Sequence, residues 1–459
     1  MKNMHLTITS GYVEYDVTTN AKGYYSVKVM PYYNSTQKTW NAFAITTNAK
    51  GYQNKTAVVY PKKNSTIKKT IKLKKQTSTI SYKKKKTINI KIQAYDLDAS
   101  SDGSVIATVP FHTMLPTAKT DGKRFLFVTN KKGKVLFQKA LPSETPYVDV
   151  SNDGKYVTVT SAYVGERKCN AIIYDKSGTE VYRTPDKMPV LNPYTLKYEK
   201  DDYVESYCAV LSNNNNILAY SSTDGGLWLI DWKNNKILSQ TDIKGQLRTI
   251  DFSKNDDLVY VTGGGGYAYC IRVSTGEIVW KSFIQTWATQ SILYKNYYIV
   301  TTKNENTTLY VLNASTGKKI WDYPTTCRGS GISVSPDGKK LWWGTDNGTT
   351  YTPLNNCIFK LSNGKLLQTF TVNGSYSGMQ AAWSKDSKSI LIKNGTGFGV
   401  YNVKTGEAYY EKKVVKNVGD SLSFSLYASS DLKYVVAGFN DNKNFRFWGK
   451  LYFFERTGK

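Results

Sequence analysis

The chain has 459 residues, of which 40% are apolar and 21% charged, a globular composition that excludes wholesale disorder. Its 62 Lys and Arg against 35 Asp and Glu give a net charge of +27, so the protein is strongly basic. With only two histidines, His5 and His112, multi-histidine metal sites and histidine-based triads are nearly excluded. Abundant Tyr and Gly are typical of strands and turns. No apolar run approaches the roughly 20 residues of a membrane helix.

Residues 6 to about 76 predict short strands separated by turns. Two N-A-K-G sequences, at 20–23 and 48–51, favour tight turns because Asn and Gly tolerate positive φ. The order TTNAKGYYSVKV, AITTNAKGY, TIKKTIKLKK resembles the carboxypeptidase regulatory-like (transthyretin-like) β-sandwich family. The positions that carry this resemblance are Gly23, Tyr24, Tyr25, Ser26, Gly51, Tyr52, Ile71 and Leu73. It implies a non-catalytic accessory domain over residues 1–78, and another immunoglobulin-like sandwich is the alternative.

A basic connector with some strands is predicted over residues 79–120. Its main feature is the run Lys83, Lys84, Lys85 and Lys86. Like charges repel and solvate, which favours an exposed connector or a strand edge protected from aggregation. The sharper hypothesis is contact with an anionic partner. These four lysines are the candidate site residues that the sequence offers.

From about residue 120 a four-stranded unit recurs, which predicts a β-propeller over 121–459. One turn of each unit falls at Gly178, Asn235, Gly276, Gly317, Gly364, Gly406 and Gly458, which are 41 to 57 residues apart. Tyr182, Trp280, Trp321 and Tyr410 each follow such a turn by four residues and are expected to wedge between neighbouring blades. These repeats resemble the pyrroloquinoline-quinone-type (quinoprotein alcohol dehydrogenase-like) and WD40-like propellers. The resemblance implies a fold and leaves function open.

The last repeat ends after its third strand, LYFFER, so its outermost strand must come from elsewhere. We expect the strand KVLFQKA, at 134–140, to complete it and so close the ring. The predicted fold class is therefore all-β, with a small N-terminal β-sandwich and a seven-bladed β-propeller. Eight blades is the alternative, if residues 95–140 build a sheet of their own.

No motif in the sequence supports catalysis. Quinone-dependent propeller enzymes often use adjacent cysteines, and the five scattered cysteines are interpreted as small core residues. Residues 96–103 resemble a calcium loop only superficially, because Ser101 and Ala107 stand where an EF-hand needs Gly and Glu. Gly263–Gly266 and the D-G-K sequences at 121–123, 153–155 and 337–339 are interpreted as hairpin turns. We expect no enzyme activity, no cofactor and no metal.

The sequence therefore favours a non-catalytic scaffold, extracellular or at the cell surface, that binds proteins or anionic polysaccharide. Self-assembly into a surface layer or filament, through an exposed strand of the N-terminal module, is a variant of this hypothesis. The alternatives are a quinone- or metal-dependent oxidoreductase and a nucleic-acid-binding propeller, for which charge is present but no motif. No leader or anchor is evident in the chain, and a cytoplasmic location is the alternative.

Overall fold

A computed structural model gives the fold, and in the part that it describes the regular secondary structure consists of β-strands. The residues described are 5–10, 13–22, 24–29, 33–34, 39–40, 43–48, 56–59, 66–71, 80–90, 96–109, 125–141, 144–162, 170–191, 198–203, 206–222, 225–243, 245–263, 265–285, 288–302, 307–325, 328–346, 355–372, 380–393, 396–415, 425–443 and 446–458. Over these ranges, no helix is long and apolar enough to cross a membrane.

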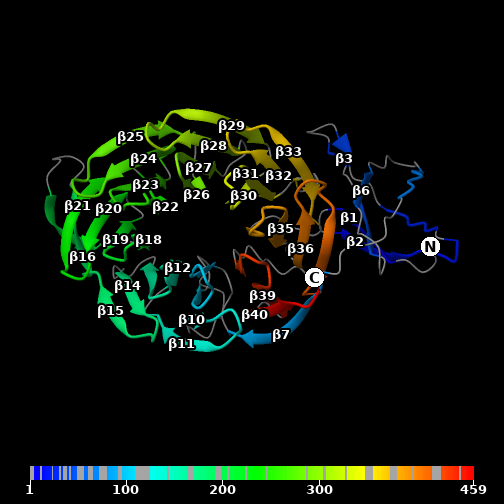
Figure 1. The fold of residues 1–459 in the computed structure, drawn as a ribbon, viewed down its shortest axis with the longest axis horizontal. Coiled ribbons are helices and arrows are strands. Elements are labelled where there is room, and N and C mark those ends of the chain that lie inside the picture. The colour runs from blue at the N-terminus through cyan, green and yellow to red at the C-terminus, as the bar shows by residue number, and fades with distance from the viewer. Residues whose placement is uncertain are drawn as a thin grey trace.

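Eight four-stranded sheets stand around a closed ring as the blades of a propeller (Figure 1). Blade 1 contains β8 (Asp96–Ala99), β9 (Ile106–Val109), β10 (Phe125–Thr129) and β11 (Val135–Ala140). Blade 2 contains β12 (Glu144–Val150), β13 (Tyr156–Ala162), β14 (Asn170–Asp175) and β15 (Glu180–Arg183). Blade 3 contains β18 (Ser206–Leu211), β19 (Ile217–Ser222), β20 (Gly226–Asp231) and β21 (Lys236–Asp242), and the hairpin β16 (Lys187–Leu191) and β17 (Tyr198–Tyr203) precedes it.

The remaining blades repeat the plan. Blade 4 contains β22 (Leu247–Phe252), β23 (Leu258–Gly263), β24 (Tyr267–Arg272) and β25 (Ile278–Phe283). Blade 5 contains β26 (Ala288–Tyr294), β27 (Tyr297–Thr302), β28 (Thr307–Asn313) and β29 (Lys319–Thr325). Blade 6 contains β30 (Arg328–Val334), β31 (Lys340–Asp346), β32 (Asn355–Lys360) and β33 (Leu366–Thr371). Blade 7 contains β34 (Gln380–Trp383), β35 (Ser389–Lys393), β36 (Gly397–Asn402) and β37 (Ala408–Lys413). Blade 8 contains β38 (Leu426–Ala428), β39 (Tyr434–Lys443), β40 (Arg446–Arg456) and β7 (Tyr82–Asn89).

Blade 8 closes the ring with a strand from the N-terminal part of the chain. In Figure 1 the blue strand β7 lies beside the red strand β40, and the two pair antiparallel from Tyr82–Arg456 to Asn89–Lys450. A closing strand was expected, but the assignment to residues 134–140 is wrong, since β11 pairs with β10 in blade 1. The reason is that β8 and β9 give blade 1 its own inner strands. The prediction of seven blades is therefore wrong, and the alternative of eight is confirmed.

The propeller also begins earlier than the predicted boundary at residue 121. Strands β7, β8 and β9 all lie in the segment expected to be a connector, and all three belong to blades. In β7 the lysines face solvent while Tyr82 is buried, as suits an outermost strand with one packed side. The high lysine content of β7 is compatible with a blade because the outermost strand of a blade has one side exposed to solvent.

Aromatic side chains join consecutive blades, as the sequence predicted. Each of the four predicted aromatic residues donates a hydrogen bond to the blade that follows. The pairs are Trp280 Nε1 to Ala314 O at 2.8 Å, Trp321 Nε1 to Leu361 O at 2.7 Å, Tyr182 Oη to Asn235 Oδ1 at 3.1 Å, and Tyr410 Oη to Tyr82 O at 3.4 Å. Gly317 has a φ of +68°, and a Cβ there would lie 2.6 Å from the Trp280 ring, so this turn needs glycine for both reasons.

The N-terminal module lies outside the ring in Figure 1. Its described part holds one four-stranded sheet in the order β2-β1-β5-β6 and a short pair, β3-β4. The strands are β1 (His5–Ser10), β2 (Val13–Thr18), β3 (Tyr33–Asn34), β4 (Thr39–Trp40), β5 (Phe43–Asn48) and β6 (Thr56–Val59). Residues 24–29 and 66–71, expected as strands, are irregular, although Val27 and Ile71 pack against Ile8 and Ile45. The carboxypeptidase regulatory-like identity stays a prediction.

The first N-A-K-G forms the predicted turn, in which the Asn20 side chain accepts from the Lys22 and Tyr24 N–H groups. Its glycine and residues 49–51 of the second N-A-K-G lie outside the described residues. Cys208, Cys270 and Cys357 are buried, in line with core positions. Cys169 and Cys327 also lie outside the described part.

Candidate functional site

One face of the propeller is built from two sets of hairpin turns, and we call it the turn face. Each blade from 1 to 7 is an antiparallel meander, so the turn between its first and second strands and the turn between its third and fourth strands lie at the same end. Backbone bonds tie the two sets together, for example Leu361 N–H to Lys339 O at 2.9 Å and Val403 N–H to Lys388 O at 3.0 Å. The turn face is thus a continuous structure and not a set of independent loops.

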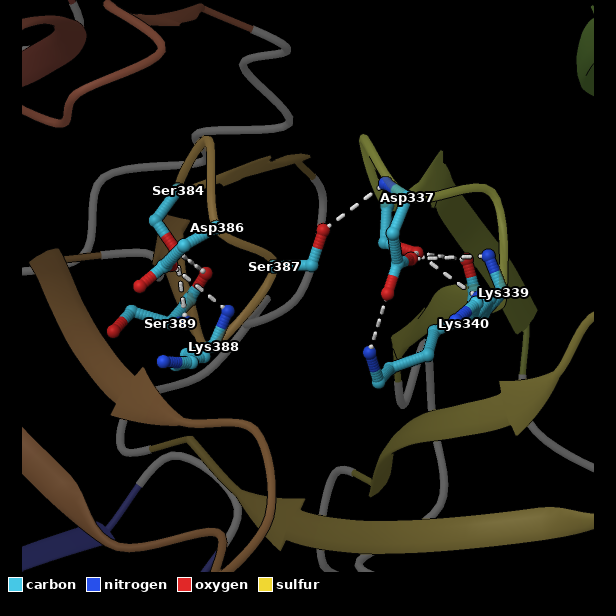
Figure 2. Close-up of polar contacts among 9 residues, drawn as sticks. Asp337, Lys339, Lys340, Ser384, Asp386, Ser387, Lys388 and Ser389 are labelled. Atoms are coloured by element: carbon cyan, nitrogen blue, oxygen red, sulfur yellow. Dashed lines mark hydrogen bonds and ion pairs between the residues drawn. The ribbon is translucent and has the colours of Figure 1, made fainter.

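The first turn of a blade has a fixed internal chemistry, which Figure 2 shows for blades 6 and 7. In blade 6 the Ser335 hydroxyl donates to Asp337 Oδ1 and accepts from the Lys340 N–H at 2.9 Å. Asp337 Oδ1 also accepts from the Lys339 N–H at 3.0 Å. Burial acts to raise the pKa of Asp337, but these hydrogen bonds and the Lys340 ammonium lower it to about 2. The carboxylate therefore stays ionised and holds the turn closed.

The same serine-centred turn occurs in seven blades of the described structure. The serine and its Asp or Asn partner two residues later are Ser100 and Asp102, Ser151 and Asp153, Ser212 and Asn214, Ser253 and Asn255, Ser335 and Asp337, Ser384 and Asp386, and Ser429 and Asp431. The residue that follows has a positive φ in every case. Blade 5 differs, with a shorter turn between Tyr294 and Tyr297. A repeated turn of this kind gives the face a regular, rigid surface.

Contacts between turns continue this order around the ring. Figure 2 shows the Ser387 hydroxyl of blade 7 accepting from the Asp337 N–H of blade 6, at 3.1 Å. Between blades 2 and 3, Asn215 Nδ2 donates to Asp153 Oδ2 at 3.0 Å. Between blades 3 and 4, the Asn213 N–H donates to Asp256 Oδ1 at 2.9 Å. Each contact fixes one turn against the next.

Exposed lysines are spread over this face. They occur in the turns of every blade: Lys132, Lys134, Lys155, Lys176, Lys233, Lys254, Lys295, Lys318, Lys339, Lys365, Lys385, Lys388, Lys404 and Lys433. Carboxylates lie between these lysines, and turn hydrogen bonds lower the pKa of Asp337 and of Asp386, so both stay ionised. The turn face therefore presents many exposed ammonium groups interspersed with carboxylates, and the ammonium groups can meet the anionic groups of a partner.

The predicted site residues Lys83–Lys86 lie on β7, at the outer rim of blade 8, and they face different groups. Lys85 pairs with Glu455 at 3.0 Å, and Lys86 donates to Gly133 O at 2.6 Å. Lys84 lies over the Tyr452 ring at 5.9 Å. The run is thus partly structural, since it fastens the closing strand to blades 8 and 1.

Sequence reasoning missed a group of half-buried acids on the innermost strands. Asp98 Oδ2 accepts from the Val150 N–H at 2.6 Å, and Asp149 Oδ2 accepts from the Leu211 N–H at 3.4 Å, so each joins one blade to the next. Burial raises the pKa of Asp98 to about 6, and burial with the nearby Asp98 charge raises the pKa of Asp96 to about 7. A sequence signal for these acids exists, since an Asp stands two residues before the turn serine in D-A-S at 98–100, D-V-S at 149–151 and D-F-S at 251–253.

The other predicted turns can be placed as well. Asp96–Ala99 is strand β8, and the turn expected at 96–103 covers only Ser101–Ser104. The D-G-K sequences at 153–155 and 337–339 form hairpin turns, and 121–123 lies outside the described residues. Gly263 ends β23, and Gly265 and Gly266 lie in the turn before β24, as predicted, whereas residue 264 lies outside the described residues. Where side chains are described, no group of three or more His, Cys, Asp and Glu residues is arranged to hold a metal ion.

Comparisons with known proteins agree on the fold. Residues 213–420 match the PQQ_2 family model, described as outer membrane protein assembly factor BamB. The crystal structure of BamB from Moraxella catarrhalis is similar with a TM-score of 0.53 at 10% identity, covering 82% of this chain and all of that one. The computationally designed Ika8 protein gives a TM-score of 0.56 at 14% identity, covering 79% of this chain and 97% of that one. No curated protein matches the sequence. The predicted resemblance to quinone-type repeat propellers is confirmed.

Proposed function

We propose that this chain is a non-catalytic scaffold at the cell surface or outside the cell, which binds acidic proteins or anionic polysaccharide through the turn face. The observation that carries the proposal is the presence of exposed lysines in the turns of every blade on that face. A BamB-like repeat propeller is consistent with a protein-binding scaffold. The family description names an outer membrane assembly factor, which favours a place in the cell envelope.

The net charge of +27 supports the same partner class. Long-range attraction increases the rate of encounter with a polyanion, while fixed turns reduce the ordering cost on binding. Ammonium groups spaced around a ring suit an extended partner with repeated carboxylates more than a small ligand. Nucleic acid satisfies the same electrostatic condition and is therefore a necessary comparison in the test.

The test compares two triple variants of equal charge. Lys155, Lys339 and Lys388 on the turn face are changed to Gln in one variant. Lys28, Lys68 and Lys69, exposed on the N-terminal module, are changed to Gln in the control. Binding to immobilised poly-glutamate, to alginate and to double-stranded DNA is measured at 50 and 300 mM salt.

The turn-face variant should lose at least tenfold in affinity for poly-glutamate or alginate, and the control less than twofold. Equal losses in both variants would show that only net charge matters and would contradict a turn-face site. Tighter binding to DNA than to both other polymers would favour the nucleic-acid alternative. Absence of binding to all three polymers at 50 mM salt would contradict the proposal.

A further inference from the structure

We infer that the outer edge of blade 4, formed by strand β25, accepts an extended segment of a partner protein with acidic and apolar residues, which pairs with it as a fifth strand. Blade 4 has the strand order β22-β23-β24-β25, so in the described structure β25 pairs with a strand on one side only. In Figure 1 it lies at the outer rim of the ring. The inference goes beyond the turn-face proposal, because it concerns a different surface and a different kind of contact.

The hydrogen bonds of blade 4 show which main-chain groups of β25 point outward. The Ile284 N–H donates to Gly266 O, on the β24 side, at 2.8 Å. Because the main-chain groups of successive strand residues point to alternate sides, the N–H and C=O groups of Lys281 and Phe283 point away from β24. Such an edge is a template for an added strand.

The equivalent edge is protected in other blades. The position to compare is the third residue after the aromatic side chain that joins each blade to the next. This residue is exposed in all four blades compared, and it is Pro185 in blade 2, Phe283 in blade 4, Pro324 in blade 5 and Lys413 in blade 7. In blade 2 the Thr184 N–H donates inward to Ala171 O at 3.0 Å, so Pro185 has the same outward direction as Phe283. Proline lacks the N–H that an added strand needs, and a lysine charge opposes pairing, so of these four edges blade 4 has the open one.

Apolar side chains on β25 add to the main-chain groups. Among the described residues of the propeller, Phe283 has the most exposed large apolar side chain, at 61%. Its ring centre lies 5.2 Å from that of Tyr267 on β24, which restricts it before any partner binds. Ile278 and Val279, at the other end of β25, are also exposed. An added strand would cover apolar surface at both ends of β25, which favours its binding.

The charge of β25 selects the partner. The exposed Lys281 has its ammonium 5.6 Å from the centre of the Tyr267 ring, and the six residues of β25 include no acid. Glu277, just before the strand, pairs with Arg272 at 3.4 Å. Because Lys281 and Phe283 are two positions apart, their side chains lie on the same side of the sheet, so the matching segment has an acid and an apolar residue two positions apart. A second copy of this chain carries the same lysine and a net charge of +27, and is therefore less suited to the edge.

The test uses the full chain and a fluorescein-labelled peptide made of two Thr-Glu-Thr-Val repeats, with binding followed by fluorescence anisotropy. The peptide should bind with a Kd below about 1 mM, and a peptide with Lys in place of Glu should bind at least fivefold more weakly. N-methylation of one alternate set of its residues should abolish binding and N-methylation of the other set should not, because only one edge of the peptide faces β25. Equal effects of the two methylated peptides, or no binding of the parent peptide at 1 mM, would overturn the inference.

Variants place the site on blade 4. Phe283→Pro copies the residue of blades 2 and 5, keeps the hydrogen bonds inside the sheet because the lost N–H points outward, and should weaken peptide binding at least tenfold. Phe283→Ser keeps the N–H, tests the apolar contact alone and should weaken binding at least threefold. Val181→Ser removes an exposed apolar side chain from the protected edge of blade 2 and should leave binding unchanged. Equal losses in Phe283→Ser and Val181→Ser would contradict a site on blade 4.

Two further measurements separate this inference from the other possibilities. In sedimentation velocity, a dimer of the full chain that Phe283→Pro abolishes would assign the edge to a second copy and overturn the choice of partner. The turn-face triple variant should bind the peptide within twofold of the unchanged chain, and Phe283→Pro should bind poly-glutamate normally. Failure of the scaffold proposal and failure of this one are therefore distinguishable.

Discussion

Blade 2 and blade 8 share one four-strand plan but differ in how the chain supplies it. All four strands of blade 2 lie between Glu144 and Arg183, whereas blade 8 takes three from Leu426–Arg456 and the fourth from Tyr82–Asn89. Most outer strands carry exposed aliphatic residues such as Val181 and Ile237, but β7 carries lysines. The closing strand therefore has to hold two ends of the chain together without a covalent turn. Its contacts should matter more than those of any other outer strand.

Among the changes compared, removal of β7 should lower the stability of the fold most. Deletion of residues 1–89 leaves Tyr452 and Phe454 without the strand that pairs with β40, so we expect the melting temperature to fall by more than about 10 °C. Deletion of residues 1–78 keeps β7 and should lower it little. Thermal unfolding followed by circular dichroism distinguishes these outcomes.

A circular permutant tests whether the pairing of β7 with β40 is the cause of this stability. Residues 79–89 placed after Lys459 through a Gly-Ser linker, with the chain starting at residue 90, should regain most of the lost stability. Blade 8 would then have the continuous order of blade 2. If the permutant melts like the deletion variant, strand pairing at β40 is not what stabilises the closure.

Tyr82 should account for much of the closing strand's contribution. It is 6% exposed, donates to Leu432 O at 2.6 Å, and packs against Phe398 and Tyr410. Tyr82→Ala should lower the free energy of unfolding by about 3 kcal/mol, as deletions of buried aromatic side chains do. Tyr82→Phe keeps the packing and should cost about 1 kcal/mol for the hydrogen bond.

Tyr182→Phe serves as the control at an ordinary seam. Its hydroxyl bonds Asn235 in an exposed position, so the loss should be smaller than at Tyr82. Urea unfolding of the three variants gives the ranking. A larger loss at Tyr182 would show that the closure is not the sensitive seam.

The fold was largely predictable because the repeats carry their own turn chemistry. Gly276, Gly317 and Gly364 have the positive φ that their turns require, and Trp280 and Trp321 bridge blades as expected. Blade number was not predictable from the same signals. Strand β8 is only four residues long and includes two acids, so it does not have the apolar pattern of an inner strand.

The candidate site was harder to predict than the fold. The run Lys83–Lys86 suggested one patch, but pairing with β40 sends its members to different partners. Lys131 and Tyr434, which lie together where blades 1 and 8 meet, belong to turns that looked ordinary in the sequence. Their proximity results from ring closure, a contact between residues more than 300 positions apart that no local pattern encodes.

A third prediction concerns the half-buried acids on the inner strands of blades 1 and 2. The pKa of Asp96 is raised to about 7 by burial and by the Asp98 charge, so its ionised form is unfavourable in the folded state. Its contribution to stability is full below pH 4 and is lost as pH rises through 7. Asp96→Asn should therefore stabilise the protein by about 1 kcal/mol at pH 8 and have little effect at pH 4.

Urea unfolding at the two pH values measures this difference. Asp251→Asn in blade 4 is the matched comparison, since Asp251 is also half-buried but accepts a hydrogen bond from the Ser291 hydroxyl, which opposes the rise in its pKa. A gain for Asp96→Asn that is the same at pH 4 and pH 8 would rule out ionisation as the cause.

The smallest expected effect concerns charge in the turns. Asp337 has a pKa lowered to about 2, despite burial, by bonds from Ser335, Lys339 and Lys340, so its contribution is present above pH 4 and is lost as pH falls through 2. Blade 3 has Asn214 at the equivalent position and keeps the same turn, so Asp337→Asn changes charge with little change in geometry. Because the side chain is a third exposed, the loss at pH 7 should be only about 0.5–1 kcal/mol and should shrink in 0.5 M salt. Urea unfolding at pH 7 and pH 3 provides the measurement, and a loss that persists undiminished in salt would point to geometry and not to charge.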